Sequence, residues 1–406
     1  MTPVRWPLHP RPRPVEALSS WLRRVATANA TTVEDLLRYD LAPVAGLADV
    51  PAPANLDWDP PAPMLQALAS RTGVSVGHLR SMTIAGWVPW LLDGLDVAGQ
   101  DVYDTYVSQH SVLLRPGQAR PRRPRQVRGG RSWLPWFAPR PDQRLPARTC
   151  PVCSTTETRY IDLLATLPLM TSCVHHGVRL VPELDVILAS VNGASAPAEP
   201  VDAAVAALDR YTYQGLTTGR VGLPGGDVHV GRWFRLLRTL LAEVSEAPSQ
   251  VGGRSAAMLR LIWQTVGQPE RAGLRVWQPY EYLDWPRQQM MLHAAATALD
   301  LVARGAIVAR GTLGRLLTPE PHQVVYAGNE PSRAAVLWRE VQRAFDEMLE
   351  RAHYEPEIAE QLLSLFTLTC RTAEAYDRER DYVIGLGIPA EFLPTAAATG
   401  RPGLVA

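Results

Sequence analysis

The sequence predicts a mainly α-helical protein in three parts: a helical N-terminal domain with a helix-turn-helix-like hairpin, a Cys3His zinc-finger module and an all-helical C-terminal domain. Three observations support this prediction. Apolar residues recur at helical spacing, strand-like alternation is scarce, and three of the four cysteines lie close together in the sequence. Changes in composition place the three parts at residues 1–114, 115–190 and 191–406.

The overall composition is that of an ordinary globular protein. The length of 406 residues allows two or three domains, each with its own core. A net charge of +1 indicates neither a strongly basic protein nor an acidic tail, so local charge matters more. The few cysteines favour a reducing compartment. Without a signal-peptide pattern or a long apolar stretch, we expect a cytoplasmic protein with no membrane span.

A proline-rich arm at residues 7–14 leads into the first predicted helix. Asn29 interrupts the helical pattern, and Thr32 with Asp35 resembles a capping box that opens a second helix. Ala-Pro and Pro-Ala pairs at residues 42–63 then predict an irregular linker. The apolar face of the first helix consists of residues at i, i+3, i+4 and i+7, namely Leu18, Trp21, Leu22 and Val25.

Residues 64–84 have the spacing of a helix-turn-helix. Gly73 permits a sharp turn after the first helix, and Ser75 can cap the second. A helical hairpin that serves only as scaffold fits the same spacing, because two short helices around a glycine are common. In a DNA-binding version, the residues facing the groove would be those at the start of the second helix, namely Ser75, Gly77, His78 and Arg80.

Residues 115–148 form an arginine-rich segment. Ten arginines stand against one acid, Asp142, which gives a local charge of +9. Such a segment attracts phosphate groups and releases counterions on binding nucleic acid, although a solvated loop is the plainer explanation. We favour nucleic-acid contact because the segment adjoins a metal-site motif. The arginines assigned to this contact are Arg120, Arg122, Arg123, Arg125, Arg128 and Arg131.

Two pairs of potential metal ligands follow this segment. They are Cys150-x-x-Cys153 and Cys173-x-x-His176, separated by nineteen residues. Two tight turns of this kind close a tetrahedral Cys3His zinc site, and we expect one structural ion per chain because no position is left for substrate. His175 is an alternative ligand, but His176 repeats the spacing of the first pair. Reduced buried thiols or a redox Cys-x-x-Cys are the competing interpretations.

The region after residue 205 consists mainly of amphipathic helices. Residues 223–226, Leu-Pro-Gly-Gly, predict a turn. Further helices are expected at about 254–267, 286–304 and 331–352, with helical sequence continuing after Pro356. The helix that follows the turn has one strongly apolar face, formed by Trp233, Leu236, Leu237, Leu240, Leu241 and Val244.

No catalytic motif stands where it could act. The glycines at residues 222–226 lack the lysine and hydroxyl of a phosphate loop, and no group of acids has the spacing of a two-metal nuclease. Helical acids such as Glu340, Asp346, Glu347 and Glu350 are explained as solvated faces beside arginines. We therefore expect a binding protein and not an enzyme.

Several of these patterns together resemble the TniQ/TnsD family of transposition target-selection proteins. The opening PLHPRPRPVEALSSWLRRVATAN is similar to the family's proline-rich arm and first helix. The stretch from Cys150 to Gly177 resembles the family's CPxC…LPLxxxCxxHG pattern, including Leu167-Pro168-Leu169. Residues 208–241 are similar to members carried by mercury-resistance-type transposons. The matches occur in the family's order over about residues 5–245.

The resemblance implies a non-catalytic adaptor. Family members recognise a target, either directly as DNA or through an RNA-guided complex, and recruit an AAA+ ATPase regulator that in turn admits a transposase. Some relatives carry further zinc knuckles, which this chain cannot build with Cys370 alone, and some form homodimers through their helical ends. The zinc ligands that the resemblance implies are Cys150, Cys153, Cys173 and His176.

Two other functions fit the same residues. The near-zero net charge and the many helical faces suit a scaffold that bridges proteins and has little affinity for DNA. A zinc-supported transcription regulator that reads DNA with residues 64–84 is the other alternative.

Overall fold

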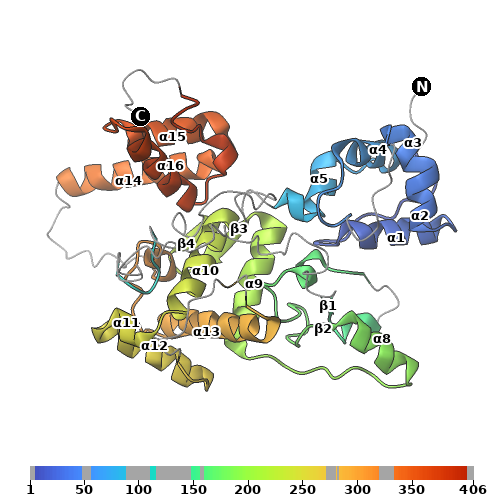
Figure 1. The fold of residues 1–406 in the computed structure, drawn as a ribbon, viewed down its shortest axis with the longest axis horizontal. Coiled ribbons are helices and arrows are strands. Elements are labelled where there is room, and N and C mark those ends of the chain that lie inside the picture. Colours follow the sequence, from blue (N-terminus) through green and yellow to red (C-terminus); the bar gives the residue numbers. More distant parts are fainter. Residues whose placement is uncertain are drawn as a thin grey trace. The chain divides into compact units, whose positions relative to one another are not determined.

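The computed structural model describes residues 5–47, 56–87, 110–115, 148–155, 160–270, 280, 283–319 and 333–399. These residues divide into two compact units. Unit 1 contains residues 5–87 and 148–217, and unit 2 contains residues 110–115 and 218–399. Helices predominate in both units (Figure 1), so the predicted mainly helical fold is confirmed. Within the described residues, the named strands form two antiparallel pairs.

Short helices form the N-terminal part of unit 1. They are α1 (Leu18–Ala28), α2 (Val33–Asp35), the π-helix η1 (Leu36–Leu41), α3 (Ala42–Ala45), α4 (Ala62–Thr72), α5 (Val76–Ser81) and the 3-10 turn η3 (Ile84–Gly86). The predicted apolar face of α1 is buried. The Thr32 hydroxyl accepts a hydrogen bond from the N–H of Asp35, as a cap should. The prediction of an irregular linker from residue 42 is wrong at α3, which is helical. Pro43 is compatible with this helix because it stands in the first turn, where no backbone N–H donor is needed.

The proline-rich arm is held against α1. The indole of Trp21 donates a hydrogen bond to the carbonyl of Pro10 at 2.7 Å. The side-chain amide of Asn29 donates to the carbonyl of Leu8 at 2.6 Å. An extended proline-rich segment leaves its carbonyls without backbone partners, and these side chains supply donors. The arm is therefore part of the fold of unit 1.

The helix–glycine–helix hairpin predicted at residues 64–84 is present. Gly73 follows α4 with a φ of +75°, a conformation that glycine adopts without strain. The hydroxyl of Ser75 accepts a hydrogen bond from the N–H of His78 at 3.2 Å and so caps α5. Leu79 is buried, and α5 packs against α4. The hairpin therefore has the predicted turn and cap.

The remainder of unit 1 surrounds the cysteine-containing region. It contains β1 (Arg148–Thr149), the 3-10 turns η5 (Cys153–Thr155) and η6 (Leu163–Thr166), β2 (Val181–Pro182), α8 (Glu183–Val191) and α9 (Ala203–Thr218). Helix α8 has no buried residue. Its apolar side chains are exposed at helical spacing, and these are Leu184, Ile187, Leu188 and Val191.

The long continuous segment of unit 2, from residue 218 onward, begins with a β-hairpin. Its elements are β3 (Arg220–Leu223), β4 (Gly226–His229), α10 (Val230–Val244), α11 (Pro248–Val251), α12 (Gly253–Val266), α13 (Trp285–Ala303), η8 (Gly314–Leu317), α14 (Arg333–Ala352), α15 (Pro356–Thr367), α16 (Ala373–Gly385) and η9 (Ala390–Phe392). The long helices lie close to their predicted bounds. The expectation that this region is all-helical is wrong at β3 and β4, which pair with Leu223 opposite Gly226 around the predicted turn.

Helix α10 is buried along almost its whole surface. The sequence predicted one apolar face, but Arg235, Arg238 and Glu243 on its other positions are also buried. Helix α13 packs against α10, and α12 packs against α13. Helices α14, α15 and α16 share a further apolar core, to which Ala242 of α10 belongs. Among the helices that the structure describes, none combines the length and the apolar character needed to cross a membrane.

Candidate metal centre

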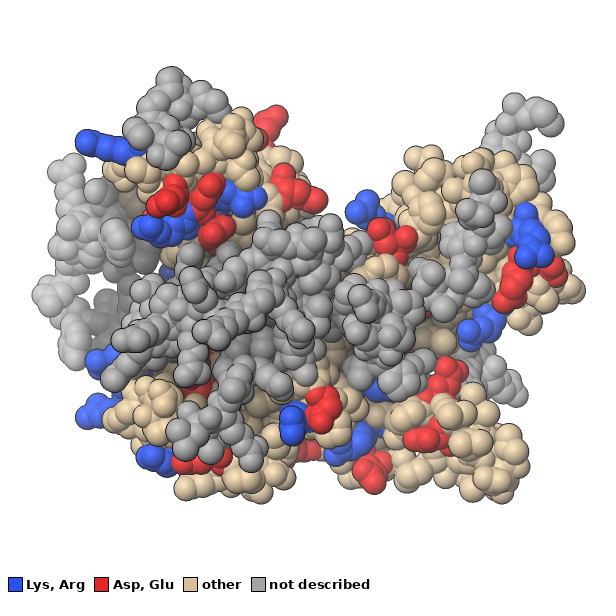
Figure 2. All heavy atoms as spheres, in the orientation of Figure 1, with Lys and Arg blue, Asp and Glu red and all other residues tan. Residues whose placement is uncertain are grey.

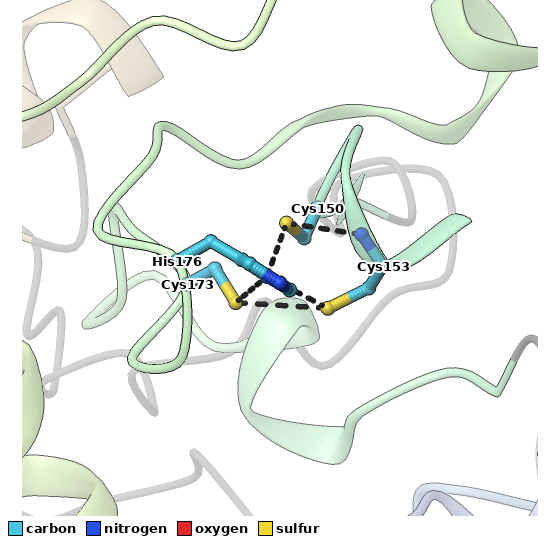
Figure 3. Close-up of side chains that lie close together, drawn as sticks. All are labelled: Cys150, Cys153, Cys173 and His176. Atoms are coloured by element: carbon cyan, nitrogen blue, oxygen red, sulfur yellow. Dashed lines mark hydrogen bonds between the residues drawn. The ribbon is translucent and has the colours of Figure 1, made fainter. Parts of the chain in front are cut away.

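Two turns bring the four predicted ligands together (Figure 3). The first turn follows β1, which pairs antiparallel with β2, and it is closed by a hydrogen bond from the N–H of Ser154 to the carbonyl of Cys150 at 3.0 Å. In the second turn, the N–H of Gly177 donates to the carbonyl of Cys173 at 2.8 Å. The N–H of Cys173 donates to the carbonyl of Val178 at 2.9 Å. Both turns are thus fixed by backbone hydrogen bonds.

The separations between the donor atoms are those of a tetrahedral zinc site. Bond lengths of about 2.3 Å for Zn–S and about 2.05 Å for Zn–N require S···S and S···N separations of roughly 3.8 and 3.6 Å. The Sγ atoms of Cys153 and Cys173 are 3.8 Å apart. The Nδ1 atom of His176 lies 3.5, 3.3 and 3.6 Å from the Sγ atoms of Cys150, Cys153 and Cys173. The donor set and its spacing therefore suit zinc.

The thiols influence one another's protonation. The hydrogen bond with Cys173 lowers the pKa of Cys150 to about 5, whereas burial raises the pKa of Cys153 to about 11. The hydrogen bond with Cys150 also raises the pKa of Cys173. The cluster by itself therefore favours a single thiolate. Because zinc binds thiolates, binding of the ion would release protons from the other two thiols.

His176, and not its neighbour His175, belongs to the cluster. The ring of His175 instead packs edge-on against Tyr213 of α9, with 5.7 Å between ring centroids. The fourth cysteine, Cys370, lies in unit 2 and packs against the core of α14, α15 and α16. The Cys-x-x-His spacing thus predicted the histidine that the fold brings to the cysteines.

Asp209 of α9 supports the second turn and was not predicted. Its carboxylate accepts hydrogen bonds from the N–H of Ser172 at 2.7 Å and from the hydroxyl of Thr171 at 3.0 Å. These residues immediately precede Cys173. Burial raises the pKa of Asp209 to about 6, and its hydrogen bonds oppose that shift.

Arg148 is a structural residue beside the cluster. Its side chain is buried and donates to the carbonyls of Met170 at 2.7 Å and Ala165 at 3.1 Å. It also donates to the carbonyl of Leu167 at 2.5 Å. Arg148 is the last arginine of the arginine-rich segment, and these contacts remove it from the set that could bind phosphate.

The N-terminal arm and the metal-binding region form one continuous structure. The N–H of Ala17 donates to the carbonyl of Ile161 at 2.9 Å, and the N–H of Leu163 donates to the carbonyl of Val15 at 2.8 Å. The hydroxyl of Ser20 accepts from the N–H of Ile161 at 2.9 Å. The chain between the two ligand pairs is therefore anchored to the start of α1.

The nucleic-acid contacts expected from the sequence remain predictions. Ser75, His78 and Arg80 are exposed, but α5 spans only six residues, Arg80 lies in its last turn, and the hydroxyl of Ser75 is used as the helix cap. The arginines predicted to contact nucleic acid all lie outside the described residues, and they are Arg120, Arg122, Arg123, Arg125, Arg128 and Arg131.

The fold and the cluster define a mainly helical protein with a Cys3His group that could hold a metal ion. Residues 7–180 match the TniQ family. The match covers the arm, the hairpin and all four potential ligands. TniQ proteins are associated with transposition and are generally non-catalytic. Neither the curated proteins nor the solved structures contain a match to the chain.

Proposed function

We propose that the protein is a non-catalytic adaptor in DNA transposition. In this role it recognises the target, either directly as DNA or through an RNA-guided complex, and recruits an AAA+ ATPase regulator. The transposase is then reached only through that ATPase. The observation that supports this proposal is the TniQ match over residues 7–180, which includes the arm, the hairpin and the four-residue cluster.

The cluster is proposed to hold one structural zinc ion per chain. Three thiolates and Nδ1 of His176 would fill the four positions of the ion, so none remains for water or substrate. The ion would then join the end of β1 to the turn at residues 173–177. In small zinc modules, metal binding contributes about 10–16 kcal/mol at neutral pH, so this region should depend on the ion for its fold.

Nucleic-acid contact is proposed for the arginine-rich segment, with Ser75, His78 and Arg80 as a second group of contacts. Figure 2 shows basic and acidic side chains interspersed on the visible described surface. A local charge of +9 therefore stands out against the rest of the chain. Such a segment gains affinity for phosphate mainly through counterion release.

The test is duplex binding at several salt concentrations. The variant Arg122→Ala/Arg123→Ala/Arg125→Ala should bind more weakly and with a shallower salt dependence, by about 0.9 in slope for each phosphate that the protein no longer neutralises. Replacement of Arg371 and Arg378, two exposed arginines of unit 2, is the control for a general change of charge. Unchanged affinity and slope in the triple variant would remove the arginine-rich segment from the interface.

A protein-bridging scaffold is the second candidate, and the exposed apolar face of α8 favours it. Leu184 and Val191 are 62% and 77% exposed, and large apolar side chains grouped on one helix face are typical of protein contacts. The proposed occupant of this face is the ATPase regulator. Capture of the ATPase after nuclease digestion should persist for a scaffold, and its loss on digestion would count against that candidate.

A further inference from the structure

Unit 2 contains a basic cavity of about 400 Å³. Its three arginines come from three separate segments: Arg115 from residues 110–115, Arg254 from the first turn of α12, and Arg310 from the loop after α13. Gly252 and Gly253 line the same cavity, and none of its lining residues is acidic. A second hollow of about 310 Å³ shares Arg254 and Arg310.

Backbone pairing holds Arg115 and Arg310 at this position. The N–H of Arg310 donates to the carbonyl of Leu113 at 3.3 Å, and the N–H of Gly311 donates to the carbonyl of Val112 at 2.9 Å. A Cβ atom at position 311 would lie 2.1 Å from the carbonyl carbon of Ser111, so only glycine allows this approach. The two arginines therefore lie at the same end of two paired segments.

Glu243 of α10 fixes the same short segment from within the core. Its buried carboxyl group accepts hydrogen bonds from the N–H groups of Val112 at 2.9 Å and Leu113 at 2.6 Å. A longer contact of 3.4 Å joins it to the N–H of Leu114. The chain is thus immobilised directly before Arg115, which is the first residue of the arginine-rich segment.

The start of α12 adds a further positive element. No side chain caps this helix and its first turn carries no acid, so the positive end of the helix dipole is uncompensated. A Cβ atom at Gly252 or Gly253 would meet nothing within 4 Å, which shows that the space beside them is open. In the part of the chain that the structure describes, Arg254 and Arg310 form no ion pair.

We propose that this cavity binds a backbone phosphate of nucleic acid. The guanidinium groups of Arg254 and Arg310 present forked donors that match phosphate oxygens, Arg115 adds a third positive charge, and the helix terminus favours the same ligand charge. Arg115 is also the first residue of the arginine-rich segment, and this continuity in sequence favours a polyanion over an isolated acidic side chain. This inference rests on the proposed role in DNA transposition and adds a contact in unit 2, where Arg254 and Arg310 lie beyond the family match.

The full-length protein is tested with a fluorescently labelled mixed-sequence duplex at several salt concentrations. Arg254→Ala/Arg310→Ala should lower the affinity on the order of tenfold, as expected when a charged hydrogen bond is removed, and reduce the salt slope by about 0.9 for one phosphate. Arg371→Ala/Arg378→Ala removes the same charge from unit 2 and should have a smaller effect. The single variant Arg254→Ala changes an exposed residue, so it should fold even if the double variant folds poorly. It should also lower the duplex affinity, but by less than the double variant.

Equal affinities of the cavity variant and the charge control would overturn the proposal, as would a wild-type protein that does not bind the duplex. If the Arg254→Ala/Arg310→Ala variant lost binding of inorganic phosphate but kept the wild-type affinity for the duplex, the cavity would be assigned to a small phosphate ligand. Loss of polyglutamate binding alone would assign it to an acidic peptide, and either result overturns the nucleic-acid assignment. ATPase recruitment is measured separately, so failure of the adaptor role is distinguished from failure of the cavity.

Discussion

The N–H of Ser172 donates a hydrogen bond of 2.7 Å to the buried carboxylate of Asp209, and Ser172 immediately precedes the potential ligand Cys173. The pKa of Asp209 is raised by burial to about 6, so the group remains largely ionised at pH 7. Its hydrogen bonds are therefore charge-assisted and stronger than neutral ones. Helix α9 thus supports the second pair of potential ligands through Asp209, which is not itself one of them.

Asp209→Asn should weaken zinc binding. The amide keeps the shape of the side chain but replaces one acceptor oxygen with a donor, which faces the N–H and hydroxyl groups of Thr171 and Ser172. Loss of such an outer partner lowers metal affinity by about 10–100-fold. Competition with a chromogenic chelator measures the change. Asp185→Asn, at an exposed position of α8, is the matched control, and equal affinities of the two variants would contradict the supporting role of Asp209.

The ligand set predicts a sharp contrast between two adjacent histidines. Wild-type protein should contain about one zinc per chain, since four protein donors complete the coordination of one ion. His176→Gln should lose the metal, whereas His175→Gln should keep it because His175 packs on Tyr213 instead. Elemental analysis of the purified variants gives the result. Retention of zinc by His176→Gln together with its loss from His175→Gln would reverse the assignment.

Cys153→Ser tests the same site from the first turn. Loss of a thiolate should leave an insoluble or locally unfolded protein, because the proposed zinc ion would no longer stabilise the module. Cys370→Ser is the matched control, since Cys370 lies in unit 2 and outside the cluster. A soluble and well-folded Cys153→Ser protein with undiminished zinc would show that Cys153 is not a ligand.

The parts of the fold that could be predicted are those encoded by local patterns. The buried face of α1, the turn at Gly73 and the two ligand pairs each depend on residues a few positions apart. Helical periodicity and ligand spacing report such arrangements directly. The proximity of the two turns to each other could also be predicted, because a closed site with four protein donors requires both turns.

The supporting carboxyl groups could not be located because their partners are distant in the sequence. Asp209 bonds residues 37 and 38 positions away, and Glu243 bonds residues about 130 positions away. Asp209 nevertheless left a signal, because it lies at helical spacing with the buried residues Val205 and Thr212 of α9. An acid in that position needs buried partners, although the sequence does not say which. Glu243 left no such signal, since it falls outside the predicted apolar face of α10.

The β-hairpin at β3 and β4 was missed for a different reason. Each strand has only four residues, and glycine within them weakens the strand pattern. Val221 and Leu223 do alternate with less buried residues, as expected for one buried face of a hairpin. The turn was therefore predicted while the strands on either side of it were not.

Glu243 should make the stability of unit 2 depend on pH. Burial raises the pKa of Glu243 from 4.5 to about 8, so the folded state holds its proton more tightly than the unfolded state. The resulting stability is fully present below about pH 4.5 and is lost as the pH rises through about 8. Glu243→Gln resembles the protonated group and should remove this dependence. Thermal unfolding of both proteins between these limits measures the difference.

The difference between wild type and Glu243→Gln isolates this group from other buried residues. Burial lowers the pKa of His353 to about 3 and that of His229 to about 2. Their contribution to the stability of the protein is therefore lost as the pH falls below 6.5, which is opposite to the trend expected for Glu243. Both proteins share that contribution. The stability of wild type relative to the variant should therefore decline with rising pH, and parallel curves would show that Glu243 has an ordinary pKa.

Gly311→Ala should destabilise unit 2 without altering any charge. The added Cβ would lie 2.1 Å from the carbonyl carbon of Ser111, against backbone atoms that cannot move aside separately. Overpacking of this kind costs about 1–3 kcal/mol, which urea unfolding measures. Gly77→Ala in α5 is the matched control, because its Cβ meets nothing within 4 Å and alanine favours a helix by up to about 1 kcal/mol. If Gly311→Ala unfolded at the wild-type urea concentration, residues 111–113 and 310–313 would not be paired this closely. Arg115 would then have no fixed place beside Arg310, because that pairing is what aligns the two guanidinium groups on one cavity.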